Sequence, residues 1–387
     1  MYISKPLIGC MSTTGKSLEP FNGIKKYIST GAVNTDTIDF SSTEDVTYRN
    51  RPSRANLVTT EGDVIFAKMK DTQKTLLISS ENVDYLYSTG FYAMTPIKEK
   101  ITSEYLFSFT NSIYFLSQKD KNCTGATQKA LNGSGLSKIR IPLPTLLDQK
   151  IIAEVLHKAS ELIMLRMQQL EKMDQLVKSQ FIELFGDPKD NTKQWPVYNL
   201  DELCKVGSSK RLYQNEQTTE GIPFLRISDL MQRIETGNED CNLFIPVERY
   251  KELKSQDLVP AVGDILVTSR GTLGACYIVK ETDSFYFQDG MISWLYRIEK
   301  SILPFYISYL FATKGFRKQI DRLQAGSTVA YLSISMMKKL RIMLPPLDIQ
   351  TQFVTFVQQV DKSKFVMNQS LERLEQCHNA LMQKAFG

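Results

Sequence analysis

The chain has 387 residues, 42% of them hydrophobic and 23% charged, and its formal net charge is +5 at pH 7. This length allows two or three domains, and the apolar content is sufficient for sizeable cores, which excludes a disordered or fibrous chain. The small excess of Lys and Arg permits a nucleic-acid partner but does not require one.

The cysteines and histidines bear on metal chemistry and on compartment. The six cysteines are scattered without a Cys-x-x-Cys pair, so a zinc ribbon or thioredoxin motif is not expected. Only two histidines occur, His157 and His378, which argues against a histidine-rich metal site. Free thiols of this kind are typical of the reducing cytoplasm, and no apolar run approaches the roughly 18 residues of a membrane-spanning helix. We therefore expect a cytoplasmic protein that holds no metal.

The chain is an internal repeat with an offset of 201 residues. Residues 125–186 and 326–387 are identical at 17 of 62 positions without a gap, where chance gives about four. The same offset places Gly62-Asp63 against Gly263-Asp264, but before about residue 57 the register drifts. A period of this length is too long for a solenoid and indicates a duplicated, pseudo-twofold molecule.

The two halves differ most at their starts. Tyr27-Ile28-Ser29 matches Phe224-Leu225-Arg226 only after a shift of about four residues. At the offset of 201, Met1 aligns with Glu202, so the first half has no counterpart of the segment 195–200. We therefore expect a first domain that is trimmed at its beginning.

In chain order, each half begins with a segment that has the pattern of a mixed α/β domain. Strand-like runs are expected at 64–67, 76–78, 265–268 and 275–279. Aromatic and aliphatic residues at spacings of three and four predict helices over 103–117 and 304–319. These globular segments are also the basic parts of the chain, which favours them as the parts that contact a polyanion.

Each half is predicted to end in one long helix. Apolar residues recur at alternating steps of four and three from Ile152 to Leu184, and eight of these ten positions are apolar. The corresponding positions from Phe353 to Ala385 are also apolar at eight of ten. A pattern sustained over five heptads favours a coiled coil of the two helices, with separate burial of each helix in its own domain as the alternative.

These elements give an α/β (α+β) fold class with two domains and two long antiparallel helices. The expected segments are a first domain at 1–145, a long helix at 146–187, a linker at 188–194, a second domain at 195–343 and a second long helix at 344–387.

No catalytic motif is complete in the sequence. The run from Gly9 to Ser17 resembles a phosphate-binding loop, but five residues separate its glycines where the motif needs four. The run from Gly271 to Gly274 lacks the full dinucleotide-binding pattern, and neither Gly-x-Ser-x-Gly nor His-Glu-x-x-His occurs. We therefore expect a protein that binds rather than catalyses.

Several runs, taken together with the duplication, resemble a known family. The first is Ile141-Pro142-Leu143-Pro144 followed by Gln149, with Leu344-Pro345-Pro346-Leu347 followed by Gln350 as its repeat. The others are the run from Gly263 to Gly274 and the run from Ile222 to Asp229. In this order they resemble the specificity (S) subunits of Type I restriction–modification systems, and the resemblance covers nearly the whole chain.

The resemblance implies two target recognition domains, each reading one half of a split DNA sequence, and a coiled coil between them whose length sets the unread spacer. It also implies two modification (methyltransferase) subunits that dock on this chain, and restriction (translocase/endonuclease) subunits that join the complex. No catalytic residue is then expected here, and S-adenosylmethionine, Mg²⁺ and ATP are expected only on the partner subunits. Domains that read different half-sites should differ where they touch bases, as the fronts of the two halves do.

Polar residues in the loops of the globular segments are the candidate DNA contacts, because Arg and Lys bind phosphates while Arg, Gln and Asn pair with base edges. In the first half these are Arg49, Arg51, Arg54, Lys68, Lys70, Lys74 and Gln128. In the second half they are Ser209, Lys210, Arg211, Arg226, Arg270, Thr272 and Thr328. The candidate residues of the coiled coil and subunit interface are Ile152, Leu156, Ile163, Leu170, Val177, Phe353, Val357, Val360, Leu371 and Leu374.

Two other hypotheses remain open from the sequence. A non-enzymatic scaffold of two α/β modules on a coiled coil would bind protein only, and a DNA affinity that falls steeply with salt would argue against it. An enzyme with an unrecognised site, such as a nuclease, would show metal-dependent cleavage by the purified chain alone.

Overall fold

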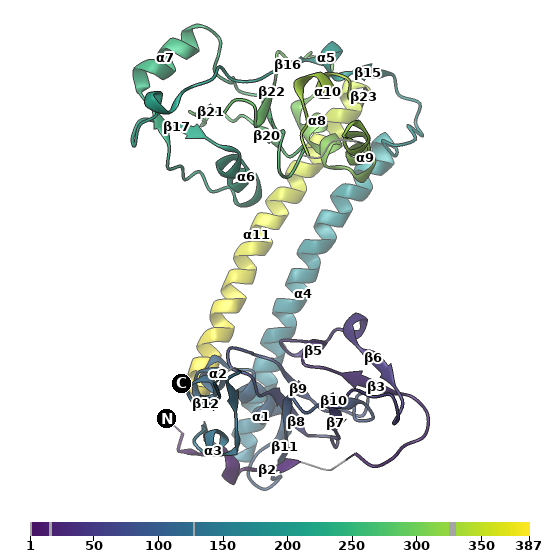
Figure 1. Ribbon diagram of the computed structural model, residues 1–387, viewed down its shortest axis with the longest axis vertical. Helices are drawn as coiled ribbons and strands as arrows, with labels where there is room; N and C mark the ends of the chain where they lie inside the picture. The colour runs from purple at the N-terminus through teal and green to yellow at the C-terminus, as the bar shows by residue number, and fades with distance from the viewer. Residues whose placement is uncertain (1, 15–17, 127, 325–329) are drawn as a thin grey trace. The chain divides into compact units, whose positions relative to one another are not determined.

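The computed structural model describes residues 2–14, 18–126, 128–324 and 330–387 (Figure 1). The chain forms two compact units. Unit 1 comprises Met1–Gln169 and Met367–Gly387, and unit 2 comprises Leu170–Val366. Unit 1 is therefore assembled from two separate stretches of the chain, whereas unit 2 is one continuous stretch.

Two long helices, α4 (Leu146–Phe185) and α11 (Leu347–Phe386), each have 40 residues and contribute to both units. At about 1.5 Å per residue, each is about 60 Å long. At the start of α4, the backbone N–H of Asp148 donates to the Thr145 hydroxyl at 3.2 Å, which satisfies one of the free N–H groups of the first turn. The helix ends before Gly186, whose φ of 79° lies in the left-handed region that favours glycine. The long helices predicted from the periodicity are confirmed.

Within each unit the two long helices pack against each other. In unit 1, Ala153 near the start of α4 shares a buried cluster with Ala385 near the end of α11, so the pair is antiparallel. In unit 2, the cluster holds Phe181 near the end of α4 and Phe353 near the start of α11. All ten of the periodic positions in each helix are buried or half-buried. The alternative of two helices buried separately in their own domains is therefore wrong.

The sheets of unit 1 are built from short strands (Figure 1). Its two four-stranded sheets have the strand orders β6-β3-β10-β7 and β2-β11-β8-β9. Their strands are β2 (Met11–Thr14), β3 (Lys25–Ile28), β6 (Glu44–Val46), β7 (Ala55–Leu57), β8 (Val64–Ala67), β9 (Thr75–Leu77), β10 (Leu86–Ser88) and β11 (Phe91–Pro96). Three two-stranded pairings join β1 (Ser4–Pro6) to β14 (Arg140–Pro142), β4 (Val33–Asn34) to β5 (Thr37–Ile38), and β12 (Cys123–Thr124) to β13 (Ala130–Leu131). Its shorter helices are α1 (Ser103–Thr110), α2 (Ile113–Lys121) and α3 (Gly133–Leu136), with 3-10 turns at Leu7–Gly9 and Phe40–Ser42.

Unit 2 has the same arrangement, except that a three-stranded sheet stands where unit 1 has the sheet β6-β3-β10-β7. Its sheets have the orders β16-β22-β19-β20, β18-β17-β21 and β15-β23. The strands are β15 (Val197–Asn199), β16 (Lys205–Gly207), β17 (Ile222–Leu225), β18 (Phe244–Ile245), β19 (Ile265–Thr268), β20 (Cys276–Ile278), β21 (Tyr286–Phe287), β22 (Ile292–Tyr296) and β23 (Arg341–Met343). The shorter helices are α5 (Leu200–Leu203), α6 (Ile227–Thr236), α7 (Val247–Ser255), α8 (Pro304–Ala312), α9 (Lys314–Leu323) and α10 (Ile334–Lys338), with a 3-10 turn at Gln214–Glu216.

The expectation that the first half lacks a counterpart of residues 195–200 is wrong. Ser4 of β1 lies opposite Pro142 of β14, as Val197 of β15 lies opposite Met343 of β23, so β1 is the equivalent of β15. The offset here is 193 residues, because unit 2 has eight more residues between the starts of β15 and β19 than unit 1 has between the starts of β1 and β8. The shift of about four residues at β3 and β17 is confirmed, since β3 pairs in parallel with β10, the strand before β11, and β17 pairs in parallel with β21, the strand before β22.

A buried glutamine joins the globular part of each unit to the start of a long helix. The side chain of Gln149 accepts a hydrogen bond from the backbone N–H of Thr102 at 3.0 Å. It donates to the carbonyls of Lys100 and Pro144 at 2.9 and 3.0 Å, and it is completely buried. In unit 2, Gln350 makes the corresponding bonds with the backbone of Leu303, Ser301 and Pro345. The Pro-x-x-x-x-Gln spacing in the sequence therefore fixes where the long helix meets the segment before α1 in unit 1 and before α8 in unit 2.

Aromatic rings pack where the long helices meet other helices of each unit. In unit 1, the Phe386 ring of α11 lies 5.3 and 5.5 Å from the rings of Tyr105 and Phe109 on α1. In unit 2, the Phe353 ring lies 5.4 Å from both Phe181 and Phe185 of α4. Each unit thus completes its core with residues from both long helices, which is why the helices fold as part of the units.

Candidate nucleic-acid interface

A turn between two paired antiparallel strands lies at the same place in both units, between β8 and β9 in unit 1 and between β19 and β20 in unit 2. We call residues 68–72 and 269–273 the recognition turns. In unit 1 the Lys68 N–H donates to the Gly90 carbonyl at 2.9 Å, and the Lys68 carbonyl accepts from the Leu131 N–H at 2.8 Å. The recognition turn therefore meets both the β10–β11 turn and strand β13.

Unit 2 makes the same backbone contacts at positions shifted by 201. The Ser269 N–H donates to Met291 at 2.9 Å, and the Ser269 carbonyl accepts from Leu332 at 3.0 Å. An isolated bridge pairs Arg270 with Tyr331, as a bridge pairs Met69 with Ala130 in unit 1. The scaffold is thus conserved between the units while the side chains at the turn differ.

Three predicted lysines of unit 1 lie on or beside the recognition turn, and each has a partner. The Lys68 ammonium donates to the Thr89 carbonyl at 2.8 Å and lies 4.6 Å from the centre of the Tyr92 ring. Burial of this ammonium lowers the pKa of Lys68 below its usual value. Lys74 donates to the Thr30 carbonyl at 2.8 Å, while Lys70 is exposed and 3.8 Å from Asp71.

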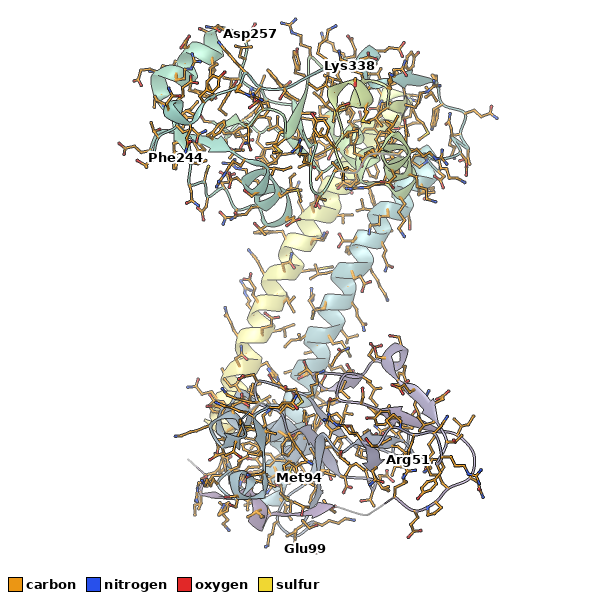
Figure 2. The ribbon with its side chains drawn as sticks, viewed as in Figure 1. Arg51, Met94, Glu99, Phe244, Asp257 and Lys338 are labelled. Atoms are coloured by element: carbon orange, nitrogen blue, oxygen red, sulfur yellow. The ribbon has the colours of Figure 1, made fainter. Side chains whose placement is uncertain are left out.

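The predicted arginines of unit 1 lie on the loop between β6 and β7. Arg51 donates to the Tyr48 carbonyl and stacks over the Tyr48 ring at 4.1 Å; it is labelled in Figure 2. Arg49 and Arg54 are exposed. The Arg54 carbonyl accepts from the Thr89 N–H at 2.9 Å, so this loop reaches the residue that binds the Lys68 ammonium.

The remaining prediction in unit 1 also falls near the recognition turn. Gln128 is exposed and directly precedes Lys129, whose carbonyl accepts from the Lys70 N–H at 3.0 Å. The structure therefore brings Arg54, Lys68, Lys70 and Gln128 to one region of unit 1. Arg49 and Arg51 lie further along the β6–β7 loop.

In unit 2, the predicted residues after β16 and β17 surround the turn between β21 and β22. The Arg211 guanidinium donates to the Asp289 carboxylate at 2.7 Å, and this contact raises the pKa of Arg211. Lys210 is exposed, and its carbonyl accepts from the Tyr286 hydroxyl at 3.0 Å. Arg226 is exposed, with its guanidinium 3.6 Å from Asp229.

Ser209 differs from the other predicted residues of unit 2. Its side chain is buried, with 8% of the residue exposed. A buried hydroxyl cannot reach a ligand in this conformation, so we leave Ser209 out of the surface proposed below.

The recognition turn of unit 2 carries two predicted residues. Arg270 is exposed, and its guanidinium lies 5.1 Å from the centre of the Tyr331 ring. Thr272 is also exposed, and its carbonyl accepts a short hydrogen bond from the Thr268 hydroxyl. The predicted Thr328 lies outside the described residues.

Some residues that shape this region were missed from the sequence. Thr89 accepts a hydrogen bond from Lys68, and Asp289 accepts one from Arg211. Lys119 of α2 and Arg317 of α9 donate to backbone carbonyls of the recognition turns. None of them carries a motif. The repeat itself is the one signal that could have directed attention to the turn at 89–90 and its counterpart at 290–291.

The predicted interface residues divide into two groups on the long helices. Leu156, Val177, Phe353, Val357 and Val360 are buried, whereas Ile152, Ile163, Leu170, Leu371 and Leu374 are half-buried. The five buried residues and Ile152 take part in the hydrophobic cores of the units. The sequence missed a second set of large apolar side chains that is exposed, comprising Leu162, Met164, Leu165 and Met167 of unit 1 and Leu176, Ile182, Phe365 and Val366 of unit 2.

The described residues offer little for metal or membrane chemistry. Over the described ranges, no cluster of three or more His, Cys, Asp or Glu side chains could hold a metal ion. No helix in the described part of the chain is both long and apolar enough to cross a membrane.

Two copies of one scaffold, with different cations and amides at equivalent turns, define a duplicated recognition protein. The model of the type I restriction modification DNA specificity domain matches residues 8–175 and again residues 192–376. The chain belongs to this family and carries its domain twice. It is therefore a DNA-recognition subunit and not a catalytic one, and the protein-only scaffold is not favoured.

Curated relatives agree with this assignment. The type I restriction enzyme MjaIX specificity subunit of Methanocaldococcus jannaschii is 26% identical over 321 residues, covering 77% of this chain and 71% of the relative. The type I restriction enzyme EcoKI specificity subunit of Escherichia coli (strain K12) is 25% identical over 354 residues, covering 84% and 74%.

A solved structure has the same fold. It is a chain from a study of complex assembly and conformational transition in the type I restriction–modification system. It matches with a TM-score of 0.65 at 20% sequence identity, covering all of this chain and 97% of the other.

Proposed function

We propose that each unit of this specificity subunit reads one half of a bipartite DNA target through its recognition turn and the loops beside it. The observation that carries the proposal is the shared backbone frame of the two turns. Lys68 bonds to Gly90 as Ser269 bonds to Met291, but Met69 stands where Arg270 does. One frame with different side chains is what two readers of different half-sites require, because base edges are distinguished by side chains.

The proposed DNA contacts are of two kinds, to phosphates and to base edges. Exposed cations such as Arg49, Arg54 and Lys210 are suited to phosphates, which position the domain without reading sequence. Arg270 and Gln128 lie at or beside the recognition turns and have the fork and amide geometries that pair with guanine and adenine edges. Lys68 and Lys74 already donate to carbonyls, and for these we propose a role in shaping the loops as well as in supplying positive charge.

The long helices are proposed to dock two modification (methyltransferase) subunits and to set the length of the unread spacer. Exposed apolar side chains that gather on a helix are a common mark of a protein-binding face. Leu162 and Leu165 in unit 1 and Phe365 and Val366 in unit 2 form such sets. Under this proposal S-adenosylmethionine, Mg²⁺ and ATP bind to the partner methyltransferase and restriction subunits, and this chain recognises the DNA target.

The recognition proposal is tested by methylome sequencing. Cells that carry this chain with its neighbouring methyltransferase subunit are compared with cells that carry the methyltransferase subunit alone. The expected result is a split methylated motif with unread bases between its halves, present only with this chain. An assembled, active complex that adds no motif would refute the proposal.

The docking proposal is tested separately by charged substitutions on the exposed apolar faces. Leu165→Glu and Phe365→Glu are each expected to weaken co-purification of a methyltransferase subunit at least tenfold. Gln168→Glu and Gln369→Glu, which change exposed polar positions of the same helices, serve as matched controls. Normal assembly of the leucine and phenylalanine variants would show that the partner docks elsewhere.

A further inference from the structure

A buried lysine of α2 hydrogen-bonds to the backbone of the recognition turn of unit 1. The Lys119 ammonium at the end of α2 donates to the carbonyls of Met69 at 2.6 Å and Thr72 at 2.7 Å, and only 1% of the side chain is exposed. The neighbouring Asp120 carboxylate lies 3.4 Å from this ammonium. The Lys119 side chain thus binds the second and the last residue of the five-residue turn.

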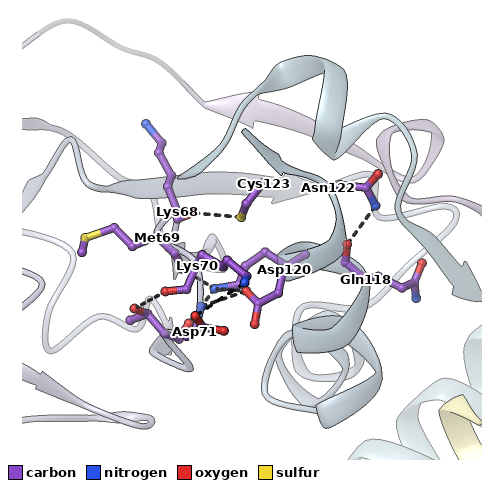
Figure 3. A network of polar contacts seen from close by, with 10 residues as sticks. Lys68, Met69, Lys70, Asp71, Gln118, Asp120, Asn122 and Cys123 are labelled. Atoms are coloured by element: carbon purple, nitrogen blue, oxygen red, sulfur yellow. Dashed lines mark hydrogen bonds and ion pairs between the residues drawn. The ribbon is translucent and has the colours of Figure 1, made fainter. Parts of the chain in front are cut away.

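Asp120 completes the attachment. Its carboxylate accepts the N–H of Asp71 at 3.1 Å, and Figure 3 shows Asp71 and Asp120 side by side. Asp71 has a φ of 56°, a left-handed conformation that a residue other than glycine adopts at a cost. The contacts from α2 therefore hold the turn at the residue whose backbone is left-handed.

A buried ammonium is costly unless its three donors are satisfied. Burial lowers the pKa of Lys119, and the Asp120 charge opposes that shift. Two carbonyls and a carboxylate account for the three donors. A lysine in such a place has a defined geometric task, because a methionine would fill a similar volume without the desolvation cost.

Unit 2 reaches its own recognition turn with a cation from a different helical turn. The Arg317 guanidinium of α9 donates to the Leu273 carbonyl at 2.7 Å. Helices α2 and α9 begin at positions related by the offset of 201, yet Arg317 corresponds to Leu116 and Lys119 corresponds to the buried Ile320. The two units therefore hold equivalent turns with non-equivalent cations, and each turn can keep its own shape.

We propose that Lys119 and Arg317 are positioning residues for half-site specificity, each fixing the recognition turn of its own unit and contacting no base itself. The inference rests on the proposed function, because it assumes that these turns face DNA. The identity and position of the cation bonded to each turn then contribute to the half-site specificity of its unit.

The test uses the full chain assembled with its methyltransferase subunit. Lys119→Met and Arg317→Met are compared with wild type by sequencing methylated sites in a randomised DNA library. Lys119→Met should relax base preference at least tenfold in one half-site and leave the other unchanged, and Arg317→Met should do the reverse. Lys121→Met and Lys318→Met, which change exposed lysines of the same two helices, should leave both half-sites unchanged.

Two further variants separate positioning from folding. Asp120→Ala removes the acceptor of the Asp71 N–H and should relax the same half-site as Lys119→Met, so the inference stays testable if Lys119→Met does not assemble. Arg317→Lys keeps a donor and should restore preference at the half-site that Arg317→Met relaxes. Equal loss at both half-sites, or unchanged preference in an assembled variant, would overturn the inference. If wild type shows no preference at either half-site, the proposed function itself fails and the inference fails with it.

Discussion

Replacing Gln149 by leucine should destabilise unit 1 selectively. Leucine has a similar volume, so the change removes hydrogen bonds without opening a large cavity. It leaves the Thr102 N–H and the carbonyls of Lys100 and Pro144 buried without the partner that satisfies them. Each such group costs about 1–3 kcal/mol, and partial relaxation and the added apolar contact offset some of the sum. We expect a loss of about 3–5 kcal/mol.

The assay is urea denaturation followed by a probe in each unit. Trp195 and Trp294 of unit 2 are intrinsic reporters, and a dye on the exposed Cys377 of α11 reports unit 1. Gln149→Leu should lower the midpoint of unit 1 and leave that of unit 2 in place, and Gln350→Leu should do the reverse. The exposed Gln168→Leu is the matched control and should change stability by less than about 0.5 kcal/mol. A loss below about 1 kcal/mol in Gln149→Leu would refute the reasoning.

Three further predictions concern the long helices. Burial lowers the pKa of His378 below its usual value, so the unfolded chain binds the proton more tightly than the folded chain does. Unit 1 should therefore lose stability as pH falls below about 6.5. Denaturation midpoints at pH 7.5 and 5.5 should differ less in His378→Gln than in wild type, and an equal difference would contradict this. Lys364→Ala breaks the ion pair with Asp174, but Asp174 is more than half exposed, so the loss should stay below about 1 kcal/mol in a double-mutant cycle. Phe353→Ala removes a buried ring packed on Phe181 and should cost unit 2 about 3–5 kcal/mol in the same denaturation assay, with a smaller loss showing that the site collapses around the gap.

The long helices could be predicted because their signal is local and repeated. A residue at every third or fourth position must be apolar if one side of a helix is to be covered, and this pattern survives at eight of ten positions in each helix. The two exceptions in α11 are accommodated by specific partners. Lys364 pairs with Asp174 at 2.6 Å, and His378 lies 3.2 Å from Ser160.

The start of the first half could not be predicted from the offset. Strand β1 is three residues long and contains Pro6, so neither alternation nor composition marks it as a strand. Its assignment depends on its pairing with β14, more than 130 residues away. A fixed offset also fails wherever one copy has gained an insertion, as unit 2 has before β19.

The polar site was only partly accessible to sequence reasoning. Lysines and arginines near turns could be identified, but whether a cation faces solvent or a carbonyl depends on contacts far along the chain. Lys119 illustrates this, since a lysine at the end of a helix is usually solvated, and its burial here follows from carbonyls about 50 residues earlier.

The division of the chain has a consequence for the order of synthesis. A ribosome that has released residues up to Val366 has supplied all of unit 2, but unit 1 still lacks Met367–Gly387. Until then Tyr105 and Phe109 are without the Phe386 ring that covers them. Unit 1 is therefore translated first and completed last. Until Met367–Gly387 are synthesised, its exposed aromatic surface is available for chaperones to bind.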